Sequence, residues 1–170
     1  YEVGPEVAAC EAILVRSHKL DSGNISAQLR AVARAGVGTN NVPVTECTEQ
    51  GVVVFNTPGA NANAVKELVL CGLLLSSRGV LLGINYVNTQ TEIVDYSALS
   101  KLMEQEKKRF KGSEITGKTL GVIGLGAIGS LVAEMAIGLG MKVQGYDPAL
   151  SVEAAWRLPS QVKRKENISS

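Results

Sequence analysis

The chain of 170 residues contains one histidine and three cysteines, and its formal net charge is only +1. A charge so close to zero creates no strong field, so composition predicts neither a nucleic-acid partner nor a membrane-surface partner. The cysteines Cys10, Cys47 and Cys71 lack metal-ligand spacing, and we predict no metal site. An odd number of thiols without a secretion signal indicates a reducing compartment, so we expect a cytoplasmic protein.

Long hydrophobic runs are also lacking. The apolar run at 68–75, "LVLCGLLL", is much shorter than the ~20 residues that a transmembrane helix needs. We expect Cys71, inside this run, to be a core residue. The short basic clusters at 106–110 and 162–166 are expected to be solvated faces of the protein.

The pattern of apolar residues predicts an α/β protein. Strand-like and helix-like segments alternate, and the strand-like runs show little alternation, as expected for parallel strands covered on both faces. The predicted strands lie within 11–17, 31–38, 51–59, 119–123 and 142–146, and the predicted helices at 24–30, 43–50, 63–78, 97–108 and 127–139.

A glycine pattern between the strand at 119–123 and the helix at 127–139 predicts a dinucleotide site. Gly124 permits a tight turn, Gly126 lets pyrophosphate approach the backbone, and Gly129 lets the helix pack closely on the strand. Asp147 lies eighteen positions after Gly129, where a carboxylate accepts hydrogen bonds from the adenosine ribose. Its charge would repel a 2′-phosphate, which favours NAD over NADP. The alternative is that the glycines only pack the helix and that Asp147 caps a turn before Pro148.

Five segments, taken in order, resemble the D-isomer-specific 2-hydroxyacid dehydrogenases. They are "ILVRSHKL" at 13–20, "VARAGVGTNNV" at 32–42, "GVVVFNTPGANANAVKELVL" at 51–70, "ITGKTLGVIGLGAIG" at 115–129 and "GYDP" at 145–148. The resemblance implies part of a flavodoxin-like substrate-binding domain at 1–78. It also implies the first half of a Rossmann NAD-binding domain at 79–170, whose residues 79–117 form a connecting helical segment. Such proteins are homodimers or larger homo-oligomers.

The resemblance also implies residues that bind a small anionic substrate. Arg16 and Ser17 occupy the family's "RS" position at the end of a strand, and an arginine fork suits phosphate or carboxylate. Gly36 lies in a glycine loop whose backbone amides would face the substrate carboxylate. Asn61 either contacts the substrate or caps the following helix. A surface arginine and a plain turn are the alternatives for Arg16 and for the loop.

For the cofactor, the resemblance implies that Val37 lies near the nicotinamide and that Ala127 and Ile128 present their backbone to the pyrophosphate. The family's catalytic arginine, glutamate and histidine come late in the Rossmann domain, after Ser170, so we assign no catalytic residue here. His18 is expected to be a polar loop residue rather than a proton-transfer group. We therefore expect the 170 residues to be a portion of a longer enzyme and to be inactive by themselves.

The function implied is NAD-dependent hydride transfer at C2 of a D-2-hydroxy acid. The leading substrate is 3-phosphoglycerate, which would be oxidised to 3-phosphohydroxypyruvate in serine biosynthesis. Glyoxylate or hydroxypyruvate reduction is an alternative, because Arg16 alone does not separate a phosphorylated substrate from a plain one. A second alternative is a non-enzymatic NAD-binding module similar to corepressors of this family.

Overall fold

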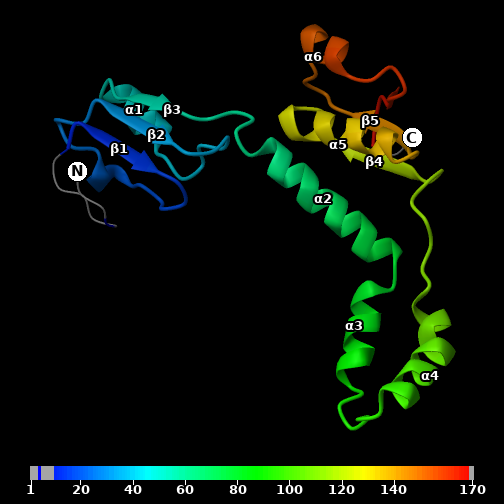
Figure 1. The fold of residues 1–170 in the computed structure, drawn as a ribbon. Helices are drawn as coiled ribbons and strands as arrows, with labels where there is room; N and C mark the ends of the chain where they lie inside the picture. The colour runs from blue at the N-terminus through cyan, green and yellow to red at the C-terminus, as the bar shows by residue number, and fades with distance from the viewer. Residues whose placement is uncertain (1–3, 5–9, 169–170) are drawn as a thin grey trace. The chain divides into compact units, whose positions relative to one another are not determined.

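The computed structural model describes residue 4 and residues 10–168. The chain divides into two compact units, Tyr1–Ala62 and Asn63–Ser170, and each contains a small parallel sheet (Figure 1). This confirms the α/β class. The domain boundary at 78–79 stays a prediction, because the division into compact units does not test it.

The first unit contains a three-stranded parallel sheet in the order β1-β2-β3. β1 spans Ala12–Val15, β2 spans Ala31–Arg34 and β3 spans Val53–Phe55, so all three lie within the predicted segments. α1 spans Val44–Glu49 and agrees with the predicted helix at 43–50. Branched side chains fit a pleated, covered surface, and those of the sheet build the core together with Cys47. The buried core residues are Ile13, Val15, Leu20, Ile25, Leu29, Val32, Val42, Cys47 and Val52.

The predicted helix at 24–30 is wrong. The structure has a short 3-10 helix at Ser22–Asn24, capped by the carboxylate of Asp21, which accepts a hydrogen bond from the N–H of Gly23. Ile25 ends it with a non-helical backbone (φ −92°, ψ 86°). An aspartate that hydrogen-bonds the local backbone favours a turn over a continued helix.

The second unit contains another parallel sheet, β4-β5-β6. β4 (Thr119–Ile123), α5 (Ala127–Gly138) and β5 (Lys142–Tyr146) form the predicted strand–helix–strand unit. α6 (Val152–Arg157) and β6 (Lys163–Arg164) were not predicted, because both are too short to show periodicity. β6 pairs in parallel with β5, so α6 lies in a second crossover connection, after the predicted one that contains α5.

Three further helices connect the two sheets in sequence. α2 spans Ala62–Ser77, α3 spans Val80–Asn88 and α4 spans Tyr96–Glu106, followed by a 3-10 turn at Lys107–Phe110. The predicted helices at 63–78 and 97–108 are confirmed, whereas α3 was not predicted as a separate helix. No single helix in the described part is long and apolar enough to cross a membrane; α2 and α3 pass that test only as a pair bent by 68°.

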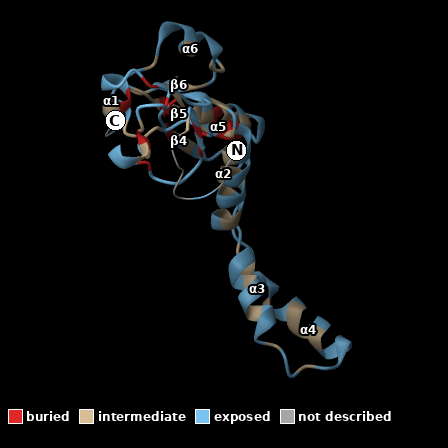
Figure 2. Cartoon of the chain, turned by 90° about the vertical axis from the view of Figure 1, so that its left-hand side faces the viewer, coloured by how far each residue is buried: buried red, intermediate tan, exposed pale blue. Residues whose placement is uncertain are grey.

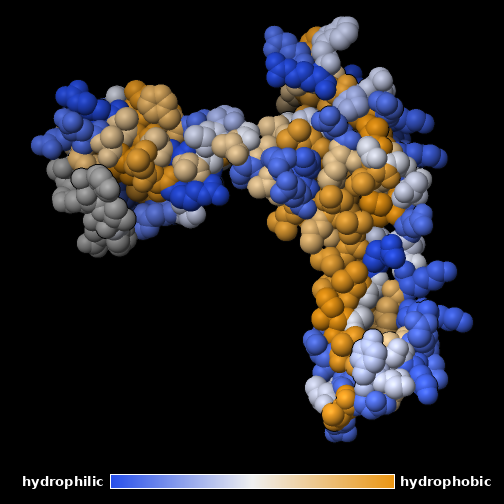
Figure 3. Space-filling model, viewed as in Figure 1, coloured by the Kyte–Doolittle hydropathy of each residue, from blue (hydrophilic) through white to orange (hydrophobic). Residues whose placement is uncertain are grey.

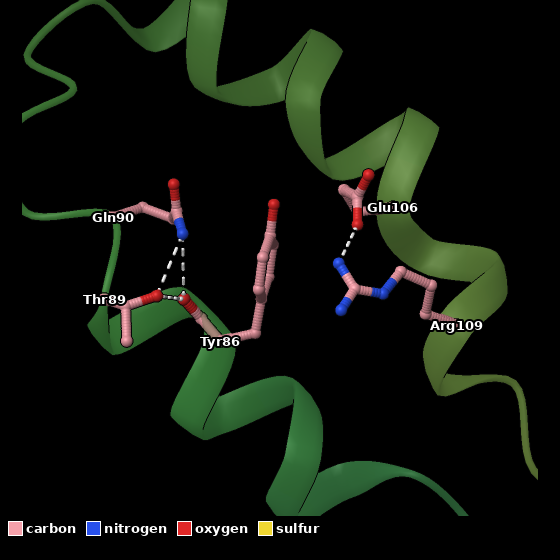
Figure 4. Close-up of polar contacts among 5 residues, drawn as sticks. All are labelled: Tyr86, Thr89, Gln90, Glu106 and Arg109. Carbon is pink, nitrogen blue, oxygen red and sulfur yellow. Dashed lines mark hydrogen bonds and ion pairs between the residues drawn. The ribbon is translucent and has the colours of Figure 1, made fainter.

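The α3–α4 pair is held by aromatic and cationic side chains. The rings of Tyr86 and Phe110 lie 5.3 Å apart, and the guanidinium of Arg109 lies 5.4 Å from the Tyr86 ring centroid. Arg109 also forms an ion pair with Glu106 (Figure 4). The N–H of Ser113 donates to the carbonyl of Ser77 at 2.8 Å. The segment that precedes α3 and the segment that follows α4 therefore lie side by side.

Burial is confined to the two sheets and the elements packed on them (Figure 2). α3 and α4 contain no buried residue. Cys71 on α2 is exposed, so its prediction as a core residue is wrong. Hydrophobic side chains are exposed along α2 and α3 (Figure 3), at Leu68 and Leu74 within this run and at Val80, Leu81, Leu82, Ile84 and Val87 of α3.

Candidate functional site

The glycine turn joins β4 to α5 with a backbone that only glycine adopts easily. Gly124 has φ +88°, and its N–H donates to the carbonyl of Tyr146 at 2.8 Å, which continues the β4–β5 pairing. A Cβ on Gly129 would stand 1.9 Å from the carbonyl oxygen of Gly124. Gly129 therefore has the predicted packing role, because any side chain there would push the helix away from the turn.

Gly126 leaves the start of α5 open. It is the N-cap residue and makes no side-chain cap, and the first backbone bond of the helix runs from the Ser130 N–H to its carbonyl at 3.0 Å. The N–H groups of Ala127 and Ile128, in the first turn, have no intrahelical acceptor. A Cβ on Gly126 would meet nothing within 4 Å. Uncapped amides and the positive end of the helix dipole favour an anion at this place.

Asp147 follows β5 and lies against the glycine turn. Its Oδ2 accepts a hydrogen bond from the N–H of Leu125 at 2.8 Å, and its Oδ1 accepts one from the N–H of Ala149 at 2.9 Å. The bond from Leu125 first, and that from Ala149 second, hold the pKa of Asp147 below its ordinary value, against a small opposing effect of desolvation. The bond from the Ala149 N–H is a turn cap, as expected by the alternative interpretation in which Asp147 only caps the turn before Pro148. Each oxygen keeps a further lone pair, so capping and ribose binding are compatible.

An open pocket of about 610 Å³ lies beside Asp147. Trp156, the only tryptophan of the chain, stands in its wall with 85% of its surface exposed, and Arg164 of β6 lies on the same pocket. The combination of an acid, a flat aromatic ring and aliphatic side chains suits an adenosine group. The lining residues are Asp147, Pro148, Leu150, Ser151, Val152, Ala155, Trp156, Leu158, Ser160 and Arg164.

In the first unit, the predicted substrate residues lie after β1. The Arg16 Nη1 donates to the carbonyl of Ala35, at the end of the neighbouring strand. Ser17 and His18 line a pocket of about 310 Å³ together with Arg16. The side-chain amide of Asn41 donates to the His18 carbonyl at 2.8 Å and fixes this loop.

In the loop after β2, a backbone amide already forms a hydrogen bond within the protein. The N–H of Gly36 donates to the carbonyl of Arg34 at 2.9 Å, so this amide is used within the protein. Val37 is exposed, and its carbonyl accepts a hydrogen bond from the Asn56 side chain at 2.8 Å. The Oδ1 of Asn61 is buried and has no hydrogen-bond partner, so it does not cap α2. The roles of these residues toward substrate and nicotinamide stay predictions.

Arg34 is a further candidate residue at this place that the sequence analysis did not name. It ends β2, its Nε is buried without a hydrogen-bond partner, and its guanidinium lies against Gly36. The available signal was its position directly before the glycine loop, on a strand parallel to the one that precedes Arg16. No three histidine, cysteine, aspartate or glutamate side chains converge anywhere in residues 10–168 in a way that could hold a metal ion.

Comparison with known proteins identifies the family. Residues 2–161 match the model of the D-isomer specific 2-hydroxyacid dehydrogenase catalytic domain. The chain belongs to this family. The D-isomer specific 2-hydroxyacid dehydrogenases are oxidoreductases, and the resemblance given by the five sequence segments is thereby confirmed.

Curated relatives include two differently named members of the family. D-3-phosphoglycerate dehydrogenase of Rattus norvegicus is 38% identical over 157 residues, which are 91% of this chain and 27% of the relative. Hydroxypyruvate reductase of Thermotoga maritima is 40% identical over 148 residues, which are 85% of this chain and 43% of the relative. The chain thus spans about a quarter of the length of the first relative and less than half of the length of the second.

Solved structures of dehydrogenases share the fold. The NAD⁺-bound 3-phosphoglycerate dehydrogenase of Entamoeba histolytica matches with a TM-score of 0.63 and 28% identity, over 92% of this chain and 41% of that one. The D-lactate dehydrogenase of Aquifex aeolicus, complexed with NAD and lactic acid, matches with a TM-score of 0.71. At 23% identity, over 92% of this chain and 43% of that one, this second match concerns the fold alone.

Proposed function

We propose that the full-length protein is an NAD-dependent dehydrogenase of a D-2-hydroxy acid. The observation that carries the proposal is the open start of α5, where Gly126 leaves the amides of Ala127 and Ile128 accessible beside Asp147. The NAD⁺-bound relative of Entamoeba histolytica supports the same cofactor. NAD, when bound, accepts or gives the hydride, and the residues of this chain hold its pyrophosphate and adenosine ribose.

The preference for NAD over NADP rests on Asp147. Its carboxylate is held ionised by two backbone N–H groups, and it would face a 2′-phosphate with like charge. Titration of the full-length protein with NADH and NADPH tests this. We expect tighter binding of NADH, and equal or tighter binding of NADPH would refute the assignment.

The domain roles follow from the same proposal. The unit Tyr1–Ala62 is then part of a flavodoxin-like substrate-binding domain, and the sheet β4-β5-β6 with α5 is the beginning of a Rossmann domain. We propose that the substrate is a small anion bound at the carboxyl edge of β1 and β2, where Arg16 lies. The arginine, glutamate and histidine of hydride and proton transfer are proposed to come from sequence after Ser170.

We propose 3-phosphoglycerate as the substrate, and hydroxypyruvate as the second candidate. The match to the rat phosphoglycerate dehydrogenase supports the first, and the match to the Thermotoga maritima reductase supports the second. Rates of NADH formation or consumption with 3-phosphoglycerate, glycerate, hydroxypyruvate and glyoxylate separate them. Binding of NADH without turnover of any of these acids would instead support a corepressor-like module.

We also propose a homodimer or larger homo-oligomer in the cytoplasm. The hydrophobic surface along α2 and α3 supports self-association, because contiguous exposed apolar surface marks interaction sites. The free thiols of all three cysteines suit a reducing compartment. Sedimentation of the full-length protein and of its Leu82→Glu variant tests the first proposal, and cell fractionation tests the second. A monomeric wild-type protein or a secreted one would contradict them.

A further inference from the structure

The loop after β2 is held in place by the segment that follows β3. β2 and β3 are adjacent parallel strands, so the two segments leave the sheet at the same edge. There the carbonyl groups of two successive loop residues accept hydrogen bonds from two successive residues of the other segment. The Gly36 carbonyl accepts from the backbone N–H of Thr57 at 3.0 Å. The Val37 carbonyl accepts from the side-chain amide of Asn56 at 2.8 Å.

These two bonds fix the direction of the next two backbone amides. All peptide bonds of the described residues are trans, and in a planar trans peptide the carbonyl of one residue and the N–H of the next point in opposite directions. Because the Gly36 carbonyl points toward the β3 segment, the N–H of Val37 points away from it. The Val37 carbonyl also points toward that segment, so the N–H of Gly38 points away from it too. Both amides are thereby directed to one side of the loop.

The two amides directed in this way are unused. Among the described residues, neither the N–H of Val37 nor that of Gly38 finds an acceptor, and both residues are exposed. The N–H of Gly36 differs, because it donates to the carbonyl of Arg34 at 2.9 Å. Adjacent backbone N–H groups that point the same way bind an anion without the help of a side chain. The anion-binding part of the loop is therefore the pair after Gly36.

The two bonds that orient the loop differ in their dependence on sequence. The bond from Thr57 comes from the backbone, so it forms with nearly any residue at that position. The bond from Asn56 comes from a side chain, so it depends on the residue type. Gly38 follows the carbonyl that Asn56 holds, and a glycine has no Cβ to restrict its backbone rotation. Without the Asn56 amide, the peptide between Val37 and Gly38 is free to turn.

We propose that Asn56 is a positioning residue, which keeps the amides of Val37 and Gly38 directed at the carboxylate of a 2-hydroxy acid. Asn56 acts through the Val37 carbonyl and does not itself contact the acid. Amides that are already aligned cost less entropy on binding, and a carboxylate strengthens both hydrogen bonds by its charge. The inference rests on the proposed function and deepens it, because it names the side chain that sets the geometry of substrate binding.

Oxamate is the probe, because it has a carboxylate next to an amide carbonyl and thus resembles a 2-oxo acid that cannot be reduced. Calorimetric titration of the full-length protein with oxamate, in the presence of saturating NADH, gives both the Kd and the number of sites. Asn56→Ala should raise the Kd for oxamate by roughly threefold to tenfold, the range of one lost hydrogen bond. The number of sites and the Kd for NADH should stay unchanged.

Two comparisons separate positioning from a general loss of structure. Asn63→Ala is the matched control, because the Asn63 side-chain amide also donates a 2.8 Å hydrogen bond, to Glu67 within α2. It should leave the Kd for oxamate unchanged. Partial unfolding would lower the number of sites without raising the Kd of those that remain. If Asn56→Ala does not fold, Asn56→Ser decides by the same criterion, because its shorter side chain does not span the distance to the Val37 carbonyl.

The outcomes also separate this inference from the proposed function. The inference is overturned if the wild-type protein does not bind oxamate, if the Kd is the same in Asn56→Ala, or if only the number of sites falls. Oxidation of a 2-hydroxy acid together with an unchanged oxamate Kd in Asn56→Ala would leave the proposed function standing and remove the inference. Oxamate binding that depends on Asn56, in a protein that oxidises no 2-hydroxy acid, would keep the inference and remove the proposed reaction.

Discussion

The backbone N–H of Leu125 donates a hydrogen bond to Oδ2 of Asp147, with a distance of 2.8 Å between nitrogen and oxygen. This bond joins the glycine turn after β4 to the carboxylate after β5. The acid is therefore held beside the open start of α5 by a bond within the protein. Such pre-organisation lowers the entropy that a cofactor must lose on binding.

Replacement of Asp147 should weaken cofactor binding. In the Asp147→Ala variant of the full-length protein, loss of charge-assisted hydrogen bonds to the ribose should raise the Kd for NADH about tenfold or more. Asp147→Asn should also reduce the preference for NADH over NADPH, because the like-charge repulsion is removed. Fluorescence titration measures both. Glu153→Gln is the control, since Glu153 is an exposed acid on the nearby α6, and an unchanged Kd in Asp147→Ala would reject the ribose role.

The stability of the protein should depend on Asp147 in a defined direction of pH. Its pKa in the folded protein is lowered, chiefly by the bond from Leu125 and then by that from Ala149, so it lies below the ordinary value of 3.8. A lowered folded-state pKa contributes stability at pH values above the unfolded pKa and loses it as the pH falls through the folded pKa. The difference in unfolding free energy between wild type and Asp147→Asn should be constant from pH 7 to pH 5 and shrink below about pH 4. A difference that persists undiminished at pH 2 would contradict the assignment.

Two glycines of the same turn should respond differently to alanine. Gly129→Ala places a Cβ 1.9 Å from the carbonyl oxygen of Gly124, so it should lower the free energy of unfolding by roughly 1–3 kcal/mol, as overpacking does. Gly126→Ala meets no atom within 4 Å, so stability should change by less than about 0.5 kcal/mol. The affinity for NADH should nevertheless fall, because the methyl group occupies the approach of the pyrophosphate. Chemical denaturation and NADH titration separate the two effects, and full NADH affinity in Gly126→Ala would argue against a cofactor at this turn.

Trp156 should report adenosine binding. It is the only tryptophan of these 170 residues and is exposed on the pocket that contains Asp147, so a base placed there should change its emission. We expect ADP-ribose and AMP to alter tryptophan fluorescence, whereas nicotinamide mononucleotide should not. Trp156→Phe should abolish this ligand-dependent change in emission. Unaltered emission at ADP-ribose concentrations that saturate binding by calorimetry would place the adenosine elsewhere.

Much of the second unit could be predicted because its signals are local. The turn from Gly124 to Gly129, the strand before it and the helix after it are encoded in adjacent residues, whose steric limits act over a few bonds. The spacing to Asp147 also follows from one helix and one short strand. By contrast, the short β6 and α6 carry too few residues for any period to appear.

Other features were decided only by contacts between distant parts of the chain. Cys71 is exposed because no element covers that side of α2 in the described residues, whereas the predicted helix at 24–30 failed for a local reason, the cap by Asp21. The side chains of Arg34 and Arg16 lie close together because β1 and β2 pair in parallel register. Local sequence determined the elements and the glycine turn, since backbone sterics act between neighbours. The tertiary structure decided which side chains face one another, since that depends on sheet register and packing among residues far apart in sequence.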